Sequence, residues 1–80
     1  MEHEFIYPLL TMPMTTGMYQ LLKKCLESEV RNQPPPYALL PQAAGLIRRG
    51  LVLVKPYVNT RGKSIMSIYI SERGKEFLTD

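Results

Sequence analysis

Arginine and lysine side chains carry the chemistry that this sequence could support. Arg61 and Lys63 flank Gly62 in a polar segment, where long cationic side chains can reach the phosphate oxygens of a nucleic acid with little steric obstruction. No acidic residue occurs between Glu29 and Glu72, although six basic residues do. A stretch with charges of one sign indicates an anionic partner. The candidate nucleic-acid contacts are five of these cations and one nearby amide: Arg61, Lys63, Arg48, Arg49, Lys55 and Gln42.

The residue types give little support for catalysis or for metal binding. The only histidine is His3 and the only cysteine is Cys25, and these two residues are too few and too far apart in sequence to predict a metal site. The acidic residues are few, and no glycine-rich phosphate loop occurs. We therefore predict a protein that is not an enzyme and that uses no metal and no cofactor. Cys25 lies in a helical pattern and is interpreted as a small buried apolar residue.

The length and composition predict a single folded domain. A chain of 80 residues can bury one core, and 45% hydrophobic with 21% charged residues is typical of a globular protein. The net charge of +3 is unevenly distributed, because residues 41–80 hold seven basic and three acidic residues, whereas residues 1–40 hold three basic and four acidic ones. The apolar runs are too short for a membrane span, and the first residues do not resemble a signal peptide. The expected location is the cytoplasm.

The chain divides into an N-terminal arm and a domain that begins near residue 15. Residues 1–14 contain two prolines and no sustained periodicity, which indicates an extended arm. From Thr15 or Thr16 as N-cap, apolar residues recur with the period of an amphipathic helix over residues 15–31. The apolar stripe consists of Met18, Leu21, Leu22, Cys25, Leu26 and Val30. Three prolines at residues 34–36 end this helix and form a stiff connector.

After the connector, the pattern favours one or two short helices over residues 37–49. Pro41 suits a first helical turn, and Gly50 is the expected residue at the C-cap. Residues 51–70 are typical of a β-hairpin with a polar turn at residues 59–63. The aliphatic run at residues 51–54 predicts a buried strand, and Pro56 predicts that this strand either lies at a sheet edge or contains a bulge.

The second strand and the last residues complete the predicted domain. Met66, Ile68 and Ile70 alternate and are expected to share one face of the second strand. Ser71 is expected to cap a short terminal helix. Phe77 and Leu78, near the end of that helix, are expected to return to the core.

Two segments of the sequence resemble the winged-helix superfamily over roughly residues 15–78. In its bacterial transcription regulators, a helix with a Leu-x-basic-basic-Gly-Leu-Val ending leads into the first wing strand, and the second wing strand leads into a Ser/Thr-x-x-Gly helix start. The matching segments are Leu46-Ile47-Arg48-Arg49-Gly50-Leu51-Val52 and Tyr69-Ile70-Ser71-Glu72-Arg73-Gly74-Lys75-Glu76-Phe77-Leu78. The resemblance implies an α+β fold: an amphipathic first helix, a shortened helical segment, a β-hairpin wing and a short C-terminal helix, with the wing on DNA.

The resemblance leaves two functions open. The segment between the first helix and the hairpin is shorter than a helix-turn-helix needs, and its expected helix offers only Gln42 to base edges. The first hypothesis is a small DNA-binding regulator that contacts duplex DNA mainly through the basic hairpin. The second is a protein-interaction module that does not read DNA sequence. The apolar arm could bind a protein partner or pair with a second copy as a homodimer.

Overall fold

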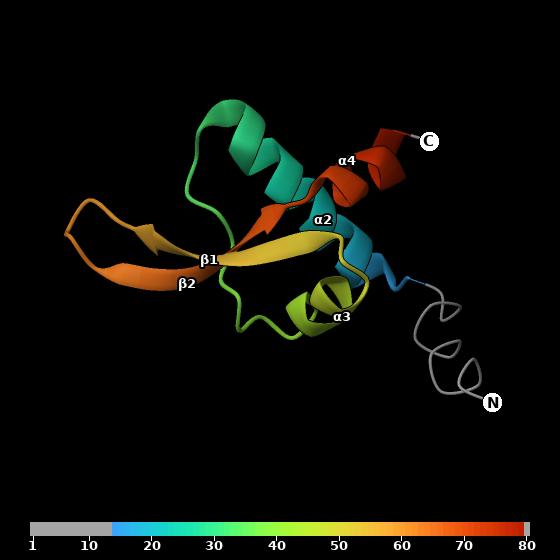
Figure 1. Ribbon diagram of the computed structural model, residues 1–80, viewed down its shortest axis with the longest axis horizontal. Coiled ribbons are helices and arrows are strands. Elements are labelled where there is room, and N and C mark those ends of the chain that lie inside the picture. Colours follow the sequence, from blue (N-terminus) through green and yellow to red (C-terminus); the bar gives the residue numbers. More distant parts are fainter. Residues whose placement is uncertain (1–13, 80) are drawn as a thin grey trace.

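The computed structural model describes residues 14–79, which form a mixed α+β domain. In chain order the elements are α2 (Thr16–Arg31), α3 (Ala43–Arg48), β1 (Val52–Val58), β2 (Ser64–Ile70) and α4 (Glu72–Thr79). Figure 1 shows the helices gathered around one end of the hairpin, whose other end projects away from them. We call residues 51–52 and 67–71 the hairpin base and residues 53–66 its outer half. The predicted α+β class is confirmed, while the predicted arm lies outside the described residues except for Met14.

Helix α2 forms where the sequence supplies a cap and an apolar stripe. The Thr15 side chain accepts a hydrogen bond from the Met18 N–H at 3.1 Å, which satisfies a free donor at the helix start. The buried face consists of Met18, Leu21, Leu22 and Cys25. The predicted helix and the predicted burial of Cys25 are therefore confirmed. Val30 departs from the predicted stripe, because it lies in the last turn, outside the core cluster, and is 74% exposed.

The connector after α2 corrects one prediction. Asn32 ends the helix with a left-handed φ of 55°, and the prolines then hold the chain extended along β2. Tyr37 pairs with Ser67 as an antiparallel bridge, and the Ile68 N–H donates to the Pro36 carbonyl at 3.0 Å. The prediction of helical structure at residues 37–40 is therefore wrong, because Tyr37 forms a bridge to β2 and residues 38–40 form a turn. Only one short helix, α3, follows before β1.

The turn from α3 into β1 contains Gly50 as predicted, but one residue beyond the expected C-cap position. Gly50 comes directly after the C-cap residue Arg49 and has a left-handed φ of 72°. The Gly50 N–H donates to the Ile47 carbonyl at 3.0 Å, and the Leu51 N–H donates to the Leu46 carbonyl at 3.1 Å. These two bonds satisfy carbonyl groups that the end of a helix leaves free.

Strands β1 and β2 pair antiparallel along their whole length, with Pro56 opposite Met66. The Asn59 N–H donates to the Lys63 carbonyl at 2.9 Å, so the hydrogen-bonded pairs fall at odd-numbered residues of β1. Pro56 occupies an even-numbered position, where an N–H would point to the open edge. The predicted edge position is confirmed, and the missing donor disfavours pairing of this edge with another strand.

The core lies between α2, α3 and the hairpin base. Leu22, Leu46 and Ile68 are fully buried at 0% exposure, and burial of each side chain stabilises the fold by about 1.5–3 kcal/mol. The buried apolar set is Met18, Leu21, Leu22, Cys25, Ala43, Leu46, Leu51, Val52, Ile68 and Ile70. Every hairpin residue in this set belongs to the base.

The outer half of the hairpin is less buried than its sequence predicts. The aliphatic run at residues 51–54 predicts a buried strand, but Leu53 and Val54 are 51% and 40% exposed. Met66 is also 51% exposed, although it alternates with the buried Ile68 and Ile70 as predicted. The helices gather at one end of the hairpin (Figure 1), and these side chains of the outer half are only partly buried.

Ser71 joins β2 to α4 and caps the helix as predicted. The Gly74 N–H donates to the Ser71 Oγ at 3.0 Å, and this Oγ donates to the Gly50 carbonyl at 2.7 Å. Leu78 packs against the core, but Phe77 is 43% exposed, so the prediction that both return to the core is wrong for Phe77. Consecutive residues of a helix project about 100° apart, so the narrow core-facing side of α4 includes Leu78 but not Phe77.

Candidate nucleic-acid interface

The turn at the tip of the hairpin is held by its backbone and by Asn59. The Gly62 N–H donates to the Asn59 carbonyl at 2.9 Å, and Gly62 has a left-handed φ of 81°. The Asn59 Oδ1 accepts the N–H groups of Arg61 and Lys63, both at 2.9 Å. This is the three-residue loop in which a type I turn precedes a left-handed residue. The predicted hairpin turn is confirmed, and its two cations project from a hydrogen-bonded unit.

Arg61 and Lys63 present their charges to solvent. Both residues are exposed, and a Cβ added to Gly62 between them would meet no atom within 4 Å. Within residues 14–79 neither side chain forms an ion pair, whereas Arg31 pairs with Glu27 and Lys75 pairs with Glu29 and Glu72. Two such cations on one turn can bind phosphate oxygens through charge-assisted hydrogen bonds.

Lys55 lies on the same hairpin but contacts an aromatic ring. Its ammonium group lies 4.8 Å from the centre of the Tyr69 ring. A cation–π contact at an exposed site contributes about 0.5–1 kcal/mol. Lys55 itself is exposed, so this weak contact leaves its charge accessible to an anion.

Arg48 and Arg49 lie at the hairpin base, apart from the tip. The seven residues of β1 separate them from the turn, which corresponds to about 23 Å at the usual rise of a strand. The Arg49 Nη1 donates to the Gly45 carbonyl at 3.0 Å, so this guanidinium also satisfies a carbonyl of α3. Arg48 is exposed. Arg61 and Lys63 therefore lie beyond one end of β1 and Arg48 and Arg49 beyond the other, with Lys55 on the strand between them.

Arg73 joins the group at the base, and sequence reasoning missed it. Its Nη1 donates to the Arg49 carbonyl at 3.4 Å and lies 3.5 Å from the position of a Cβ on Gly50. In the sequence Arg73 follows Glu72, just outside the acid-free stretch. The sequence did contain a signal for its position. A helix is predicted directly after the second strand, and the antiparallel second strand returns the chain to the end of the hairpin where β1 begins.

Helix α3 offers few groups to the edges of bases. The helix has six residues, and Gln42 occupies its N-cap position without a capping hydrogen bond from its side chain. The Gln42 side chain lies against α2, where its Nε2 is 3.1 Å from the position of a Cβ on Gly17. The exposed residues of α3 include Ile47 and Arg48. An aliphatic side chain and a lone cation provide little of the donor and acceptor pattern that base reading requires.

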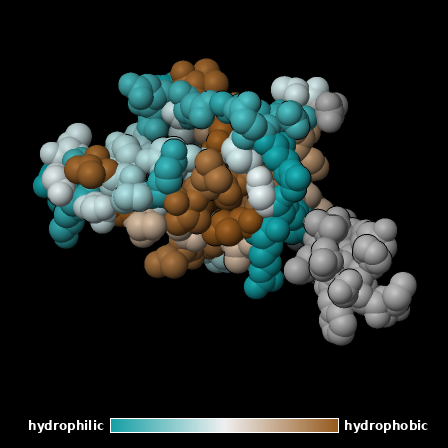
Figure 2. All heavy atoms as spheres, viewed as in Figure 1, coloured by the Kyte–Doolittle hydropathy of each residue, from teal (hydrophilic) through white to brown (hydrophobic). Residues whose placement is uncertain are grey.

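An apolar face accompanies the basic turn. Val54, Val58 and Met66 share one face of the outer half, and they are 40%, 62% and 51% exposed. Figure 2 shows hydrophobic side chains gathered over the middle of the view, where β1 runs in Figure 1. Contiguous exposed apolar surface is typical of a site that contacts a partner.

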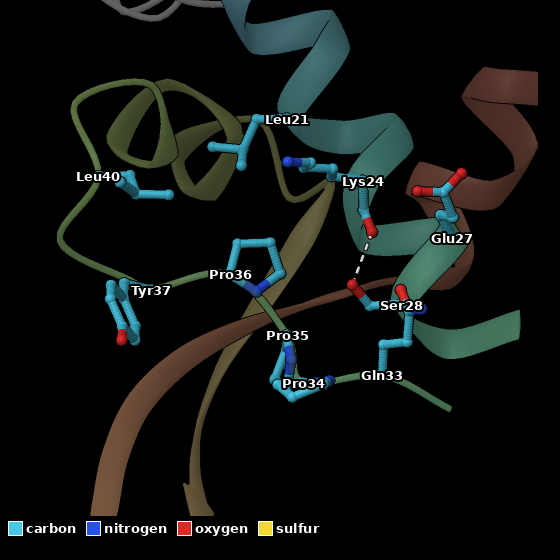
Figure 3. Close-up of a pocket in the computed structure, with 10 residues that line it drawn as sticks. All are labelled: Leu21, Lys24, Glu27, Ser28, Gln33, Pro34, Pro35, Pro36, Tyr37 and Leu40. Atoms are coloured by element: carbon cyan, nitrogen blue, oxygen red, sulfur yellow. Dashed lines mark hydrogen bonds between the residues drawn. The ribbon is translucent and has the colours of Figure 1, made fainter. Parts of the chain in front are cut away.

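A groove of about 520 Å³ lies between α2 and the proline connector. Figure 3 shows Leu21 and Lys24 on α2 across from the prolines at residues 34–36. The Ser28 hydroxyl donates to the Lys24 carbonyl at 2.8 Å, so it is already engaged within the helix. The lining contains one carboxylate, Glu27, and no histidine or cysteine. Its composition does not indicate catalytic chemistry.

Residues 14–79 contain no group of three or more side chains suited to hold a metal ion. Cys25 is 2% exposed, and its burial raises the pKa of the thiol to about 11. A thiol with such a pKa stays protonated at neutral pH and is a poor nucleophile.

Comparison with known protein families, with curated proteins and with solved structures finds no match to this chain. Among the helices of residues 14–79, none has both the length and the hydrophobicity needed to cross a membrane. Inferences about function therefore depend on the chemistry of the hairpin.

Proposed function

We propose that the protein is a small DNA-binding regulator of winged-helix type, with no catalytic activity, that contacts the phosphates of duplex DNA mainly through its hairpin. One observation carries this proposal. The hydrogen-bonded turn at Asn59 holds two exposed cations, Arg61 and Lys63, in a stretch of sequence without acidic residues. Because the turn is preordered, binding loses little conformational entropy there.

The proposed contact is with phosphates and carries little sequence information. Helix α3 has six residues, and the side chain of its N-cap residue Gln42 lies beside Gly17 of α2. Contacts to phosphate give affinity and orientation, whereas sequence is read through base edges. We therefore expect binding that depends strongly on salt and weakly on the sequence of the duplex.

Fluorescence anisotropy with a labelled duplex at about 50 to about 200 mM salt tests this function. The double substitution Arg61→Ala, Lys63→Ala should weaken binding by more than about ten-fold and reduce the slope of log K against log salt by about 2. The matched control is Lys23→Ala, Lys24→Ala, which removes the same charge from exposed residues of α2. No duplex binding by the native chain at low salt, or an equal loss in both double variants, would contradict the proposal.

A second candidate function is a protein-interaction module that does not read DNA. The exposed apolar face formed by Val54, Val58 and Met66 favours it. The N-terminal arm could add to such a contact or join two copies into a homodimer. Analytical ultracentrifugation of the full chain and of a chain lacking residues 1–13 tests the arm. A dimer that becomes a monomer on deletion supports dimerisation through the arm, whereas the same oligomeric state for both chains contradicts it.

A further inference from the structure

Three tyrosines share one face of the hairpin. Tyr57 alternates with Lys55 on β1, and Tyr69 of β2 lies on the same face, where its ring contacts the Lys55 ammonium. Tyr37 joins them because it pairs with Ser67, which lies opposite Lys55 in the hairpin. Residues directly opposite one another in antiparallel strands project to the same side. We call Tyr37, Tyr57 and Tyr69 the tyrosine face.

A hollow of about 170 Å³ lies within the tyrosine face and is lined by Tyr37 and Tyr57. Ser67 also lines it, and this small side chain leaves room beside the two rings. Tyr37 is 57% exposed, and Figure 3 shows its ring turned away from the side chains of α2. A flat aromatic ligand placed here can stack on tyrosine, which favours offset or edge contacts between rings.

The hollow adjoins the basic turn. Asn59 and Thr60 also line it, and the Asn59 side chain accepts the N–H groups of Arg61 and Lys63. Asn59 therefore belongs both to the hollow and to the hydrogen-bonded unit that holds the two cations. No acidic residue lines this hollow, whereas the groove beside α2 contains Glu27. A nucleotide joins a flat base to a phosphate, and the hollow and the turn together offer an aromatic surface for the first and cations for the second.

We propose that the tyrosine face stacks on unpaired bases of single-stranded DNA while Arg61 and Lys63 hold the adjoining phosphates. Bases within a duplex already stack on one another, so the tyrosines gain contact only where DNA is single-stranded or locally opened. Stacking tolerates any sequence, because every base has a flat face. The inference rests on the phosphate contact of the proposed function and specifies the strandedness of the DNA.

Fluorescence anisotropy with probes of equal length tests the inference: an oligothymidylate, a fully paired duplex, and that duplex with a central mismatched bubble. Tyr37→Ala is the main variant because Tyr37 is exposed and lies outside the buried core. Tyr37→Phe, which keeps the ring, is the matched control. We expect Tyr37→Ala to weaken binding of the oligothymidylate and of the bubble by about 5- to 100-fold. Binding of the paired duplex should change by less than about two-fold, as should all binding by Tyr37→Phe.

Equal affinity of the native chain for oligothymidylate and duplex, or an equal loss on both probes in Tyr37→Ala, would overturn the inference. The Arg61→Ala, Lys63→Ala variant separates this outcome from failure of the proposed function. If that variant loses duplex binding while Tyr37→Ala changes nothing, the phosphate contact stands and the stacking fails. If the native chain binds oligothymidylate through Tyr37 but never binds duplex, the tyrosine face stands and the duplex proposal fails.

Discussion

The two halves of the hairpin share the same strands but occupy different environments. At the base, Val52 and Ile68 are 3% and 0% exposed and belong to the core cluster together with residues of α2 and α3. In the outer half, Val54 and Met66 lie on the same sheet face but are 40% and 51% exposed. The residue types are similar, so the difference arises from the position of the helices along the strands.

This contrast assigns different tasks to the two halves. Side chains at the base stabilise the fold, because water is excluded from around them. The outer half keeps its shape through the strand ladder and the turn at Asn59, which satisfy backbone groups without a core. Its side chains therefore remain available to a partner. Paired substitutions, one in each half, measure how complete this division is.

The largest expected contrast is between neighbouring apolar residues on one face of β2. Ile68→Ala removes a fully buried side chain and should lower the free energy of unfolding by about 4 kcal/mol. Met66→Ala removes a side chain that is 51% exposed and should cost less than about 1 kcal/mol. Urea denaturation followed by circular dichroism measures both. Similar losses in the two variants would show that the outer half is buried in solution.

The glycines of the two halves provide the next contrast. A Cβ on Gly74 would collide with the Leu51 carbonyl oxygen and lie 2.8 Å from the Ile70 Cγ1, so Gly74→Ala should cost about 3 kcal/mol. Gly62 has open space around it, and Gly62→Ala should cost about 1 kcal/mol through its left-handed φ alone. Thermal unfolding of both variants tests the order. A larger loss at Gly62 would contradict the division between a packed base and an open tip.

The elements could be predicted from the sequence wherever the signal is local. The periodicity and cap of α2, the turn at Gly50, the turn at residues 59–63 and the cap at Ser71 all depend on neighbours within a few residues. The failures depend on distant parts of the chain. The aliphatic run at residues 51–54 cannot reveal how far the helices extend over it, and the local pattern at residues 37–40 cannot reveal that Tyr37 pairs with Ser67 of β2.

In the candidate site, too, the local groupings could be predicted from the sequence and the long-range ones could not. Arg61 and Lys63 could be grouped from the sequence because one turn holds both. The separation of Arg48 from them depends on the length and direction of β1, and the approach of Arg73 depends on the return of α4 to the base. The contribution of Tyr37 could not be predicted, since it follows from a bridge across 30 positions of sequence to Ser67.

A smaller contrast concerns the polar side chains that cap each half. Ser71→Ala at the base removes the acceptor of the Gly74 N–H and the donor to the Gly50 carbonyl, and should cost about 2 kcal/mol. Asn59→Ala at the tip removes an acceptor for two N–H groups that water can reach, and should cost about 1 kcal/mol or less. Urea denaturation again gives the values. Asn59→Ala should also weaken duplex binding, whereas Ser71→Ala should leave it unchanged in the folded protein.

The smallest contrast uses pH and the buried thiol of Cys25. Burial raises its pKa from 9.0 to about 11, so above pH 9.0 the thiol ionises in the unfolded chain before it does so in the folded one. The stabilisation is complete below pH 9.0 and is lost as the pH rises toward about 11. Between neutral pH and about pH 10, the free energy of unfolding of the native chain should therefore fall by at most about 1.4 kcal/mol more than that of Cys25→Ala.

A thiol moved to the outer half provides the control for this measurement. In a Cys25→Ala background, Val58→Cys places a thiol where the native side chain is 62% exposed. That thiol should react rapidly with a disulfide reagent at neutral pH, and its ionisation should not change the free energy of unfolding, because water surrounds it in both states. Slow reaction of the thiol at position 58 would mean that the apolar face is already covered in solution, by the arm or by a second copy.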